Sequence, residues 1–353
     1  MREDHRSQPV ERPPLAPFKT SRIKDVAREA GVSTATVSHV INGTKYVTDD
    51  TRKRVLDAIE RCEYHPNAHA RSLASGRSNM LGLLISDISN PFFPEVVKSI
   101  EAAAFEHGYN VILLNTNYDP ERAADYVRRL SELKMAGVAL MTSELDSELF
   151  HEITRRQVSV VFDSHDLASD HMSNICVDYA AGIEEAVRHL VSLGHRRIAH
   201  IAGASRIPSG VIRREAFLDF MKRYLPDEPA PAVYEGDFRL DGGRAAASEM
   251  LSAPEMPTGV VVANDMMALG ARREFRKAGL SIPRDISLVG FDDIAFAALS
   301  EPPLTTVCSP RAEIGRRVVE ALVTMIERPD QKGSELRIPT HLITRDSTAP
   351  PRR

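Results

Sequence analysis

The chain has 353 residues, which is too long for one typical domain and suits two or three. Hydrophobic residues make up 42% of it, enough for a real core. No run of about eighteen apolar residues is present, so the composition predicts a soluble protein and excludes a transmembrane helix. Cys62, Cys176 and Cys308 form no CxxC pair, which argues against a disulfide framework or a structural zinc site and suits a reducing cytoplasm.

The net charge of −4 at pH 7 hides an asymmetry along the chain. Residues 18–78 hold 11 basic and 7 acidic side chains, a net charge of +4, whereas residues 79–353 hold 31 basic and 39 acidic ones, a net charge of −8. A basic head attracts phosphate groups and an acidic body favours solubility, so the distribution agrees with nucleic-acid binding. An imbalance of this size is also common as mere surface composition.

The first 20 residues are polar and rich in proline. They contain no apolar segment of the kind that a secretion signal requires. We therefore expect residues 1–20 to form a disordered tail.

Residues 21–65 have the pattern of a three-helix bundle. Apolar residues recur at helical spacing from Ile23 to Ala30, and Gly31 can take the positive φ that ends a helix. A second and a third helix follow, each with its own apolar side. The size and the basic charge of this bundle suit a DNA-binding headpiece.

The second of these helices begins where Ser33 can cap it by accepting hydrogen bonds from free backbone N–H groups. Its outward surface combines two pairs of residues spaced four apart, Thr34 with Ser38 and Ala35 with His39. Side chains this small fit into a DNA major groove and can bind base edges or phosphates, so the pattern indicates a helix-turn-helix. The alternative is an ordinary helical hairpin, because short patterns of this kind also arise by chance.

Residues 66–78 have the composition of a linker. A short helix between Asn67 and Ala74 carries only one large apolar side chain, Leu73, so it cannot build a core of its own. An isolated exposed leucine usually has no function. Beside a DNA-binding bundle, it can instead be a wedge that enters between base steps from the minor groove.

From Met80 onward, short apolar runs rich in β-branched residues alternate with amphipathic stretches. The runs are LGLLIS, YNVILLN, GVALMT, VSVVF, RIAHIAG, TGVVVAN and DISLVGF. This alternation predicts right-handed βαβ units and parallel sheets. The runs are too many for one usual sheet, so we expect two doubly wound lobes with a ligand in the cleft at the carboxyl ends of the strands. Residues 347–353, which include TAPPRR, are expected to form a disordered tail.

The segments IKDVAREAGVSTATVSHVIN, ARSLASG, SNPFF, LGHRRIAHIAG, VANDMMALGA, SLVGFDD and PPLTTV follow one another along the chain. With these motifs in this order, the chain resembles the lactose-repressor (LacI/GalR) family of bacterial transcription regulators, nearest its ribose- and purine-repressor branch. The resemblance implies an all-α helix-turn-helix headpiece and an α/β core of two doubly wound parallel-sheet lobes, like the type I periplasmic binding proteins. It implies a headpiece at 21–65, a hinge helix at 66–78 and a core at 79–346. Within the core, lobe 1 is expected at about 79–178 and 309–338, and lobe 2 at about 179–308 and 339–346.

The resemblance also implies which residues contact DNA. Base contacts are expected from Thr34, Ala35 and His39. Phosphate contacts are expected in part from Ser33, Thr36 and Ser38, and the wedge of the hinge helix is expected to be Leu73. Family members are usually homodimers. Two hinge helices would then meet over the centre of a pseudo-palindromic operator and kink it.

In the cleft, the resemblance implies a set of residues that holds a small-molecule effector. They are Asn90, Phe92, Phe93 and Asp163 in the first lobe, and Arg213, Phe238, Asn264 and Asp292 in the second. Buried hydroxyl groups need hydrogen-bond partners and C–H faces prefer flat apolar surfaces, so this mixture suits a monosaccharide or a related polyol.

Some of these residues have ordinary structural alternatives. Either Phe92 or Phe93 can belong to the core of the following helix, and the two aspartates can be caps or turn residues. One of Arg213 and Arg214 is expected to face solvent. Asp265 is expected to cap a helix rather than to contact the effector.

Four positions depart from the family pattern. Arg22 stands where a capping threonine is common, so either Ser21 caps the first helix or the cap is lost. Ala74 follows the hinge leucine where one branch has lysine. Ser164 and Ser309 replace stronger polar groups of ribose binders, so the effector need not be ribose.

Together these features predict a transcriptional regulator, by preference a repressor, whose affinity for double-stranded operator DNA is controlled by a sugar in the cleft. It is expected in the cytoplasm at the nucleoid, with no cofactor, metal or membrane. The alternative is a solute-binding protein of periplasmic type, which the core alone permits but which the basic head and the missing signal peptide disfavour. An enzyme has no support, because G-x-G-x-x-G after the first strand, Gly-x-Ser-x-Gly and metal-ligand clusters are all missing, so no catalytic residue is assigned.

Overall fold

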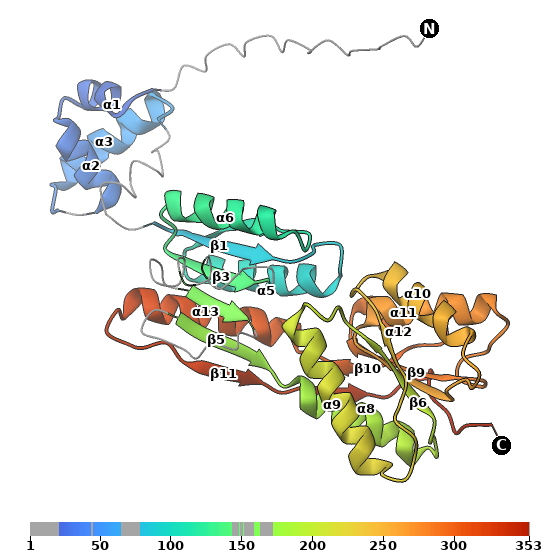
Figure 1. Cartoon of the computed structure of the whole chain (residues 1–353). Helices are drawn as coiled ribbons and strands as arrows, with labels where there is room; N and C mark the ends of the chain where they lie inside the picture. Colours follow the sequence, from blue (N-terminus) through green and yellow to red (C-terminus); the bar gives the residue numbers. More distant parts are fainter. Residues whose placement is uncertain are drawn as a thin grey trace, which may run out of the picture. The chain divides into compact units, whose positions relative to one another are not determined.

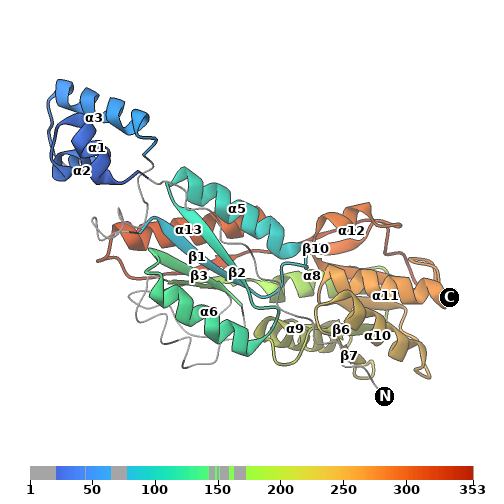
Figure 2. The same cartoon turned by 90° about the horizontal axis from the view of Figure 1, so that it is seen from above.

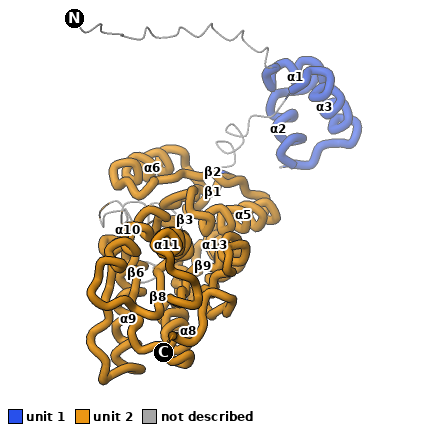
Figure 3. Tube along the Cα trace, turned by 90° about the vertical axis from the view of Figure 1, so that its right-hand side faces the viewer, with its two compact units in different colours: residues 1–78 blue, residues 79–353 orange. Residues whose placement is uncertain are grey.

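The computed structural model describes residues 21–43, 45–64, 78–142, 148, 151, 159–162 and 172–352. The chain divides into two compact units, residues 1–78 and residues 79–353, which Figure 3 shows in different colours. Several predictions fall outside the described residues: the N-terminal tail, the hinge helix, Leu73, Ala74, Asp163 and Ser164.

The first unit contains the predicted helix-turn-helix bundle (Figure 1). Its helices are α1 Ile23–Ala30, α2 Thr34–Asn42 and α3 Asp49–Arg61. Val26, Val37 and Val55 are completely buried between them, one from each helix. Gly31 ends α1 with a φ of 63°, which a residue without a side chain adopts at little cost.

At the start of α1 no side-chain cap hydrogen bond is made from the N-cap position, so of the two alternatives that the sequence left open, the loss of this cap is the one observed. Arg22 occupies the N-cap position, and its backbone N–H donates to the Asp25 carboxylate at 3.0 Å. An acidic side chain in the first turn therefore supplies half of a capping box from inside the helix. Neither Ser21 nor a threonine is needed to satisfy this donor.

The second unit contains two lobes, each built around a parallel sheet. In the first lobe the strand order is β11-β5-β4-β3-β1-β2, and all neighbouring strands run parallel. The strands are β1 Met80–Ile85, β2 Asn110–Asn115, β3 Gly137–Met141, β4 Ser159–Phe162, β5 Met172–Val177 and β11 Glu335–Ile338. The helices are α5 Phe92–Glu106, α6 Pro120–Glu132 and α13 Arg311–Glu327.

Helices cover both faces of this first sheet. Leu83 packs into the cluster that includes Val96 of α5, whereas the next residue, Leu84, packs with Val127 and Leu130 of α6. Successive side chains of a strand point to opposite faces, so α5 and α6 lie on opposite sides of the sheet, as Figure 2 shows. This is the doubly wound arrangement that the sequence predicts.

In the second lobe the strand order is β12-β10-β9-β8-β6-β7, and only the β10–β12 pair is antiparallel among the described strands. The strands are β6 Ile198–Ala202, β7 Val233–Glu235, β8 Gly259–Val262, β9 Ser287–Asp292, β10 Thr305–Cys308 and β12 His341–Ile343. The helices are α8 Tyr179–Ser192, α9 Pro208–Tyr224, α10 Leu240–Leu251, α11 Asp265–Lys277 and α12 Ala295–Leu299.

The chain crosses between the two lobes three times. The crossings lie between β5 and α8, between β10 and α13, and between β11 and β12. Each lobe is therefore completed by a segment distant in sequence. The crossings follow the carboxyl ends of β5, β10 and β11. The loops at the carboxyl ends of the strands of both lobes therefore meet at one cleft.

The sequence predicts a disordered tail over residues 347–353, and this prediction is wrong for residues 347–352. Ser347 is only 1% exposed, and its hydroxyl donates to the Leu288 carbonyl at 2.6 Å and accepts from the Thr305 N–H at 2.8 Å. The Ala349 carbonyl lies 2.9 Å from Nε2 of His195. Polar side chains and backbone groups of the segment thus find buried partners on the second lobe.

Candidate functional site

The outward surface of α2 is built from small polar side chains. Ser33 caps the helix: its Oγ accepts the backbone N–H of Thr36 at 3.1 Å and lies 2.9 Å from the Thr36 hydroxyl. Ser33, Thr34 and Ala35 are exposed, whereas Thr36, Ser38 and His39 are half-buried. The structure therefore brings the six predicted DNA-contacting residues of α2 together on the start and outer side of one helix.

The chemistry of this surface suits a nucleic acid. Val37 and Val40 fix the inner side of α2 in the bundle, so the outer side is held as a rigid unit. Hydroxyl and imidazole groups at such a position can bind base edges or phosphate oxygens. Sequence reasoning missed one neighbour: Tyr46, in the loop after α2, is 90% exposed, and its proximity in sequence to Lys45 was the available signal.

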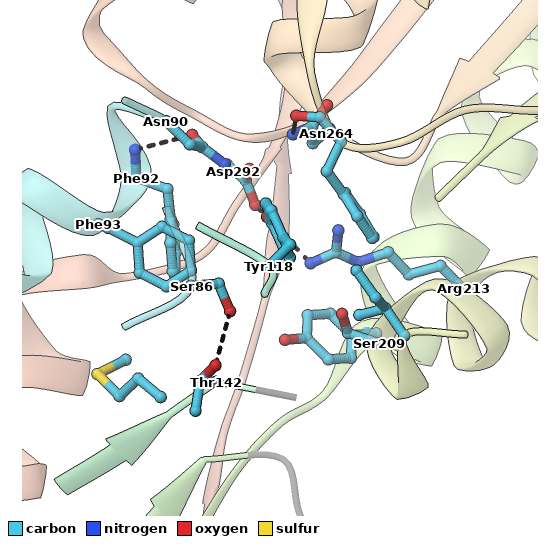
Figure 4. A pocket seen from close by; sticks show the side chains of 14 residues that line it. Ser86, Asn90, Phe92, Phe93, Tyr118, Thr142, Ser209, Arg213, Asn264 and Asp292 are labelled. Carbon is cyan, nitrogen blue, oxygen red and sulfur yellow. Dashed lines mark hydrogen bonds and ion pairs between the residues drawn. The ribbon is translucent and has the colours of Figure 1, made fainter. Parts of the chain in front are cut away.

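The cleft of the second unit contains a pocket to which both lobes contribute (Figure 4). From the first lobe it is lined by Ser86, Asn90, Phe92, Phe93, Tyr118, Met141 and Thr142, and from the second by Tyr179, Ile207, Ser209, Arg213, Phe238, Asn264 and Asp292. Its empty volume is about 580 Å³ with the open space at its mouth included. The pocket joins all the described members of the predicted effector set, and Asp163 alone of that set lies outside the described residues.

Arg213 is the central charged group of the pocket, and it is only 5% exposed. Its guanidinium carbon lies 4.2 Å from the ring centroid of Tyr179 and 4.3 Å from that of Phe291. One nitrogen, Nη1, donates to the Ala263 carbonyl at 2.6 Å, and Nη2 lies 3.8 Å from the Asp292 carboxylate. The buried Nε has no hydrogen-bond partner in the structure, so the hydrogen-bonding capacity of the guanidinium is not fully used.

The neighbour Arg214 is exposed, so Arg213 is the member of the pair that faces the pocket. The position of Arg213 on α9 explains why it faces inward. Phe217, one turn further along α9, is completely buried, and Arg213 lies on the same side of the helix.

Asp292 lies beside Arg213, and a second buried aspartate, Asp265, interacts with Asp292. Burial raises the pKa of Asp292 to about 6, and the charges of Arg213 and Arg311 oppose this rise. Burial also holds the pKa of Asp265 well above its usual range, and the nearby Asp292 adds to the effect. Asp265 accepts the Thr306 hydroxyl at 2.6 Å and the Ile294 N–H at 2.9 Å, so it does not cap α11 as the sequence predicts.

The cap of α11 is Asn264, which also lines the pocket. Its Oδ1 accepts the Met267 N–H at 2.9 Å and its Nδ2 donates to the Phe238 carbonyl at 2.9 Å. Asn90 likewise uses Oδ1 for the Phe92 N–H, at 3.1 Å. An amide nitrogen carries two hydrogens, so Asn264 has one N–H left for a ligand while its orientation is fixed by the other bonds.

Non-glycine residues with positive φ gather around this pocket. Tyr118, Phe238 and Asp292 have φ values of 59°, 66° and 106°. Such conformations are costly for residues with a side chain and cluster where a site requires them. At these positions the backbone geometry turns a ring or a carboxylate into the cleft.

Sequence reasoning missed the other half of the lining residues. Ser86 and Thr142 end the runs LGLLIS and GVALMT, so the rule that ligands bind at the carboxyl ends of strands would have found them. Tyr118 follows β2 by the same rule. Ile207 and Ser209 belong to the start of α9, a helix that the sequence pattern does not reveal.

Two statements about metals and membranes hold for the described part of the chain. In that part, no group of three or more His, Cys, Asp or Glu side chains is arranged to hold a metal ion. None of its helices combines the length and the apolar character needed to cross a membrane.

Comparison with known proteins places both units among regulators. The family "Bacterial regulatory proteins, lacI family" matches residues 22–67, and the "Periplasmic binding protein-like domain" matches residues 187–348. The chain is 36% identical over 327 residues to the ribose operon repressor of Escherichia coli (strain K12), covering 92% of this chain and 99% of that protein. It is 33% identical over 330 residues to catabolite control protein A of Priestia megaterium, covering 92% and 98%.

Solved structures also match the chain. The lac repressor dimer bound to operator and the anti-inducer ONPF matches with a TM-score of 0.83 at 29% identity, over 94% of this chain and 100% of that one. A LacI family transcriptional regulator from Enterococcus faecium with bound ribose matches with a TM-score of 0.70 at 29% identity, over 77% and 100%.

Proposed function

The chain belongs to the lacI family of bacterial regulatory proteins, and from this premise we propose that it is a sugar-controlled repressor that binds operator DNA as a homodimer. One relative of comparable length is named a ribose operon repressor, and a structural relative is a dimer on operator DNA. In the homodimer, two copies of α2 read the two halves of a pseudo-palindromic site. A protein with this task works in the cytoplasm beside the chromosome.

We infer that α2 contacts DNA through Ser33, Thr34, Ala35, Thr36, Ser38 and His39, with Leu73 as a wedge in the minor groove. The support for α2 is that these side chains share the outer side of a helix whose inner side is locked by Val37 and Val40. The support for Leu73 is its place in the linker sequence.

The pocket supports a monosaccharide or polyol as the effector. Aromatic rings of Phe92, Phe93, Tyr118 and Phe238 supply flat apolar surfaces, and Arg213 and Asp292 supply a donor fork and an acceptor. Rings stack on the C–H faces of a sugar while polar groups bind its hydroxyls. The observation that carries this proposal is the combination of a buried, incompletely satisfied Arg213 with rings contributed by both lobes.

The mechanism follows from the two-lobed pocket. An effector that touches both lobes binds the closed arrangement better than an open one, and so changes the population of the two. Where the first lobe carries the linker to the headpiece, this shift changes the pairing of the two hinge helices. Operator affinity then changes with effector occupancy.

Two titrations test the proposal. Calorimetry on the full chain with D-ribose, D-glucose, D-fructose and, as a different class, hypoxanthine identifies which compound binds. Mobility-shift assays at fixed salt, on operator fragments selected from random DNA, then measure operator affinity with and without that compound. Binding of a sugar that changes operator affinity supports the proposal, whereas equal affinity for operator and random DNA would refute it.

A further inference from the structure

A single side chain of the second lobe, Arg239, reaches three residues of the first lobe. Its Nε lies 3.4 Å from the Asp87 carboxylate, and its Nη2 donates to Oδ1 of Asn117 at 3.1 Å. A longer contact of 3.5 Å joins Nη2 to the Asn117 carbonyl. The guanidinium carbon also lies 5.3 Å from the ring centroid of Tyr118, within cation–π range.

Both ends of this bridge are held in place. On the second lobe, the backbone N–H of Arg239 donates to the Asp237 carboxylate at 2.8 Å. On the first lobe, Asp87 is only 4% exposed, and its other oxygen accepts both the N–H and the hydroxyl of Ser89, at 2.9 and 2.7 Å. Asn117 and Tyr118 have φ values of 58° and 59°, conformations that persist only where neighbours hold them.

The bridge lies at the rim of the effector pocket. Arg239 follows Phe238 directly, Asp87 follows Ser86 directly, and Tyr118 lines the pocket itself. The bridge is also far in sequence from the three chain crossings. By contrast Arg311, which bonds Glu95 of the first lobe and the Asp292 carbonyl of the second, begins α13 at a crossing.

We propose that Arg239 is an interlobe positioning residue that keeps the cleft closed over the effector and thereby sets effector affinity. Opening the lobes must break its contacts with Asp87, Asn117 and Tyr118 together. Each alone is weak because half of the Arg239 side chain is exposed, but contacts that separate in one step act jointly. The role in effector affinity rests on the proposed function; the role in closure does not.

The chain offers a matched control on α10, the helix whose N-cap residue is Arg239. Arg244 is 40% exposed, compared with 46% for Arg239, and it pairs with Asp241 and Glu274, both in the second lobe. Arg244→Ala removes a similar cation and its ion pairs without touching the first lobe. A difference between Arg239→Ala and Arg244→Ala therefore reports the interlobe contacts.

The first measurement follows closure without any ligand. Spin labels are attached to cysteines introduced at Glu132 in α6 and Glu249 in α10, both exposed, in the full chain with its native cysteines replaced by serine. Double electron–electron resonance then gives the distance distribution between the lobes. We expect Arg239→Ala to add a longer-distance population that Arg244→Ala lacks, and Arg239→Lys, which keeps the charge but loses the fork, to fall between them. Identical distributions for Arg239→Ala and Arg244→Ala would overturn the proposal.

The second measurement uses D-ribose as the probe in calorimetric titrations. We expect Arg239→Ala to raise its Kd by about tenfold and Arg244→Ala by less than about twofold, because the binding-competent closed population shrinks only in the first. Asp87→Asn should weaken binding in the same direction, and combining it with Arg239→Ala should add little. Unchanged ribose affinity in Arg239→Ala would refute the affinity role. A changed distance distribution in a protein that binds no sugar would support the bridge and refute the sugar effector.

Discussion

Arg213 carries a positive charge into a pocket whose other walls combine aromatic rings with polar side chains. It stays there because its guanidinium lies against the rings of Tyr179 and Phe291, donates to a backbone carbonyl and faces Asp292. A planar fork makes all these contacts at once, and an ammonium group does not. The geometry of arginine, beyond its charge, is what the pocket uses.

Arg213→Lys should therefore lower effector affinity by about tenfold or more, because the change keeps the charge but removes the stacking and the bidentate donors. Calorimetry with the sugar found by the ligand screen measures it. Arg214→Lys, on the exposed neighbour, serves as the control and should leave the affinity unchanged. Equal affinities in the two variants would contradict a direct role for Arg213.

If Asp292 binds the effector as proposed, effector binding should depend on pH. The pKa of Asp292 is raised to about 6 by burial, so the carboxylate is ionised at pH 7 and largely protonated at pH 5. A hydroxyl group of the effector that donates to Asp292 binds the ionised carboxylate better than the protonated acid. Effector affinity should then be constant above about pH 7 and fall by about tenfold between pH 7 and pH 5.

Titrations at several pH values check this expectation. Asp292→Asn should bind more weakly at pH 7 and lose the pH dependence, because the amide does not titrate in this range. Stronger binding at low pH in the unmodified chain would mean that the protonated acid donates to the effector, and would reverse the assigned role.

At the scale of the helices and strands, the sequence predicts correctly those elements whose apolar residues form one continuous run or one face, separate from the polar residues. The headpiece helices show apolar residues at helical spacing, and strands such as β1 and β9 are short, mainly apolar runs. Helix α9 does not, because it buries Arg213 among apolar side chains and leaves other residues of mixed character exposed. Strand β5 carries Ser173 and Asn174, each 2% exposed, where a strand pattern requires apolar residues.

The same limit applies to the pocket. The family resemblance located residues on motifs such as SNPFF, but Tyr118 and Tyr179 lie in segments without such a motif. Their role depends on a backbone turn and on a chain crossing. These are tertiary features, which local periodicity does not encode.

Helix α2 leads to a prediction about DNA. His39→Ala should relax the preference for one base position and cost about 1–3 kcal/mol on the best operator, because a half-buried imidazole on the outer side of α2 can read a base edge. Binding measurements on the operator and on variants of each base pair test it. An equal loss on every DNA sequence would show instead that His39 contacts phosphate.

The C-terminal segment leads to a prediction about stability. Deleting residues 347–353 removes Ser347, which bonds Leu288 and Thr305, and the Ala349 carbonyl beside His195 and Ser287. Leaving several buried polar groups unpaired should lower the free energy of unfolding of the core by about 2–4 kcal/mol, measured by urea denaturation. Deleting only residues 352–353 removes an exposed ion pair and should have almost no effect. Equal stability of the two truncations would mean that the segment contributes nothing to the fold.

At the scale of the whole molecule, the headpiece and the effector pocket belong to different compact units joined through the linker after residue 64. Under the proposed function, an effector bound in the pocket acts by changing the relative populations of states that differ in operator affinity. In that proposal, the lobe arrangement that Arg239 bridges is the element on which effector occupancy acts.

Thermodynamic linkage gives this coupling a strict test. If saturating effector changes the operator Kd by some factor, saturating operator must change the effector Kd by the same factor in the same direction. Both are measured on the full chain at one salt concentration, by fluorescence anisotropy with labelled operator and by calorimetry with the sugar. Arg239→Ala should alter both factors together, because it changes the closed population that the two ligands share. Effector binding with no change in operator affinity, in a chain that binds operator specifically, would show that the two units are not coupled.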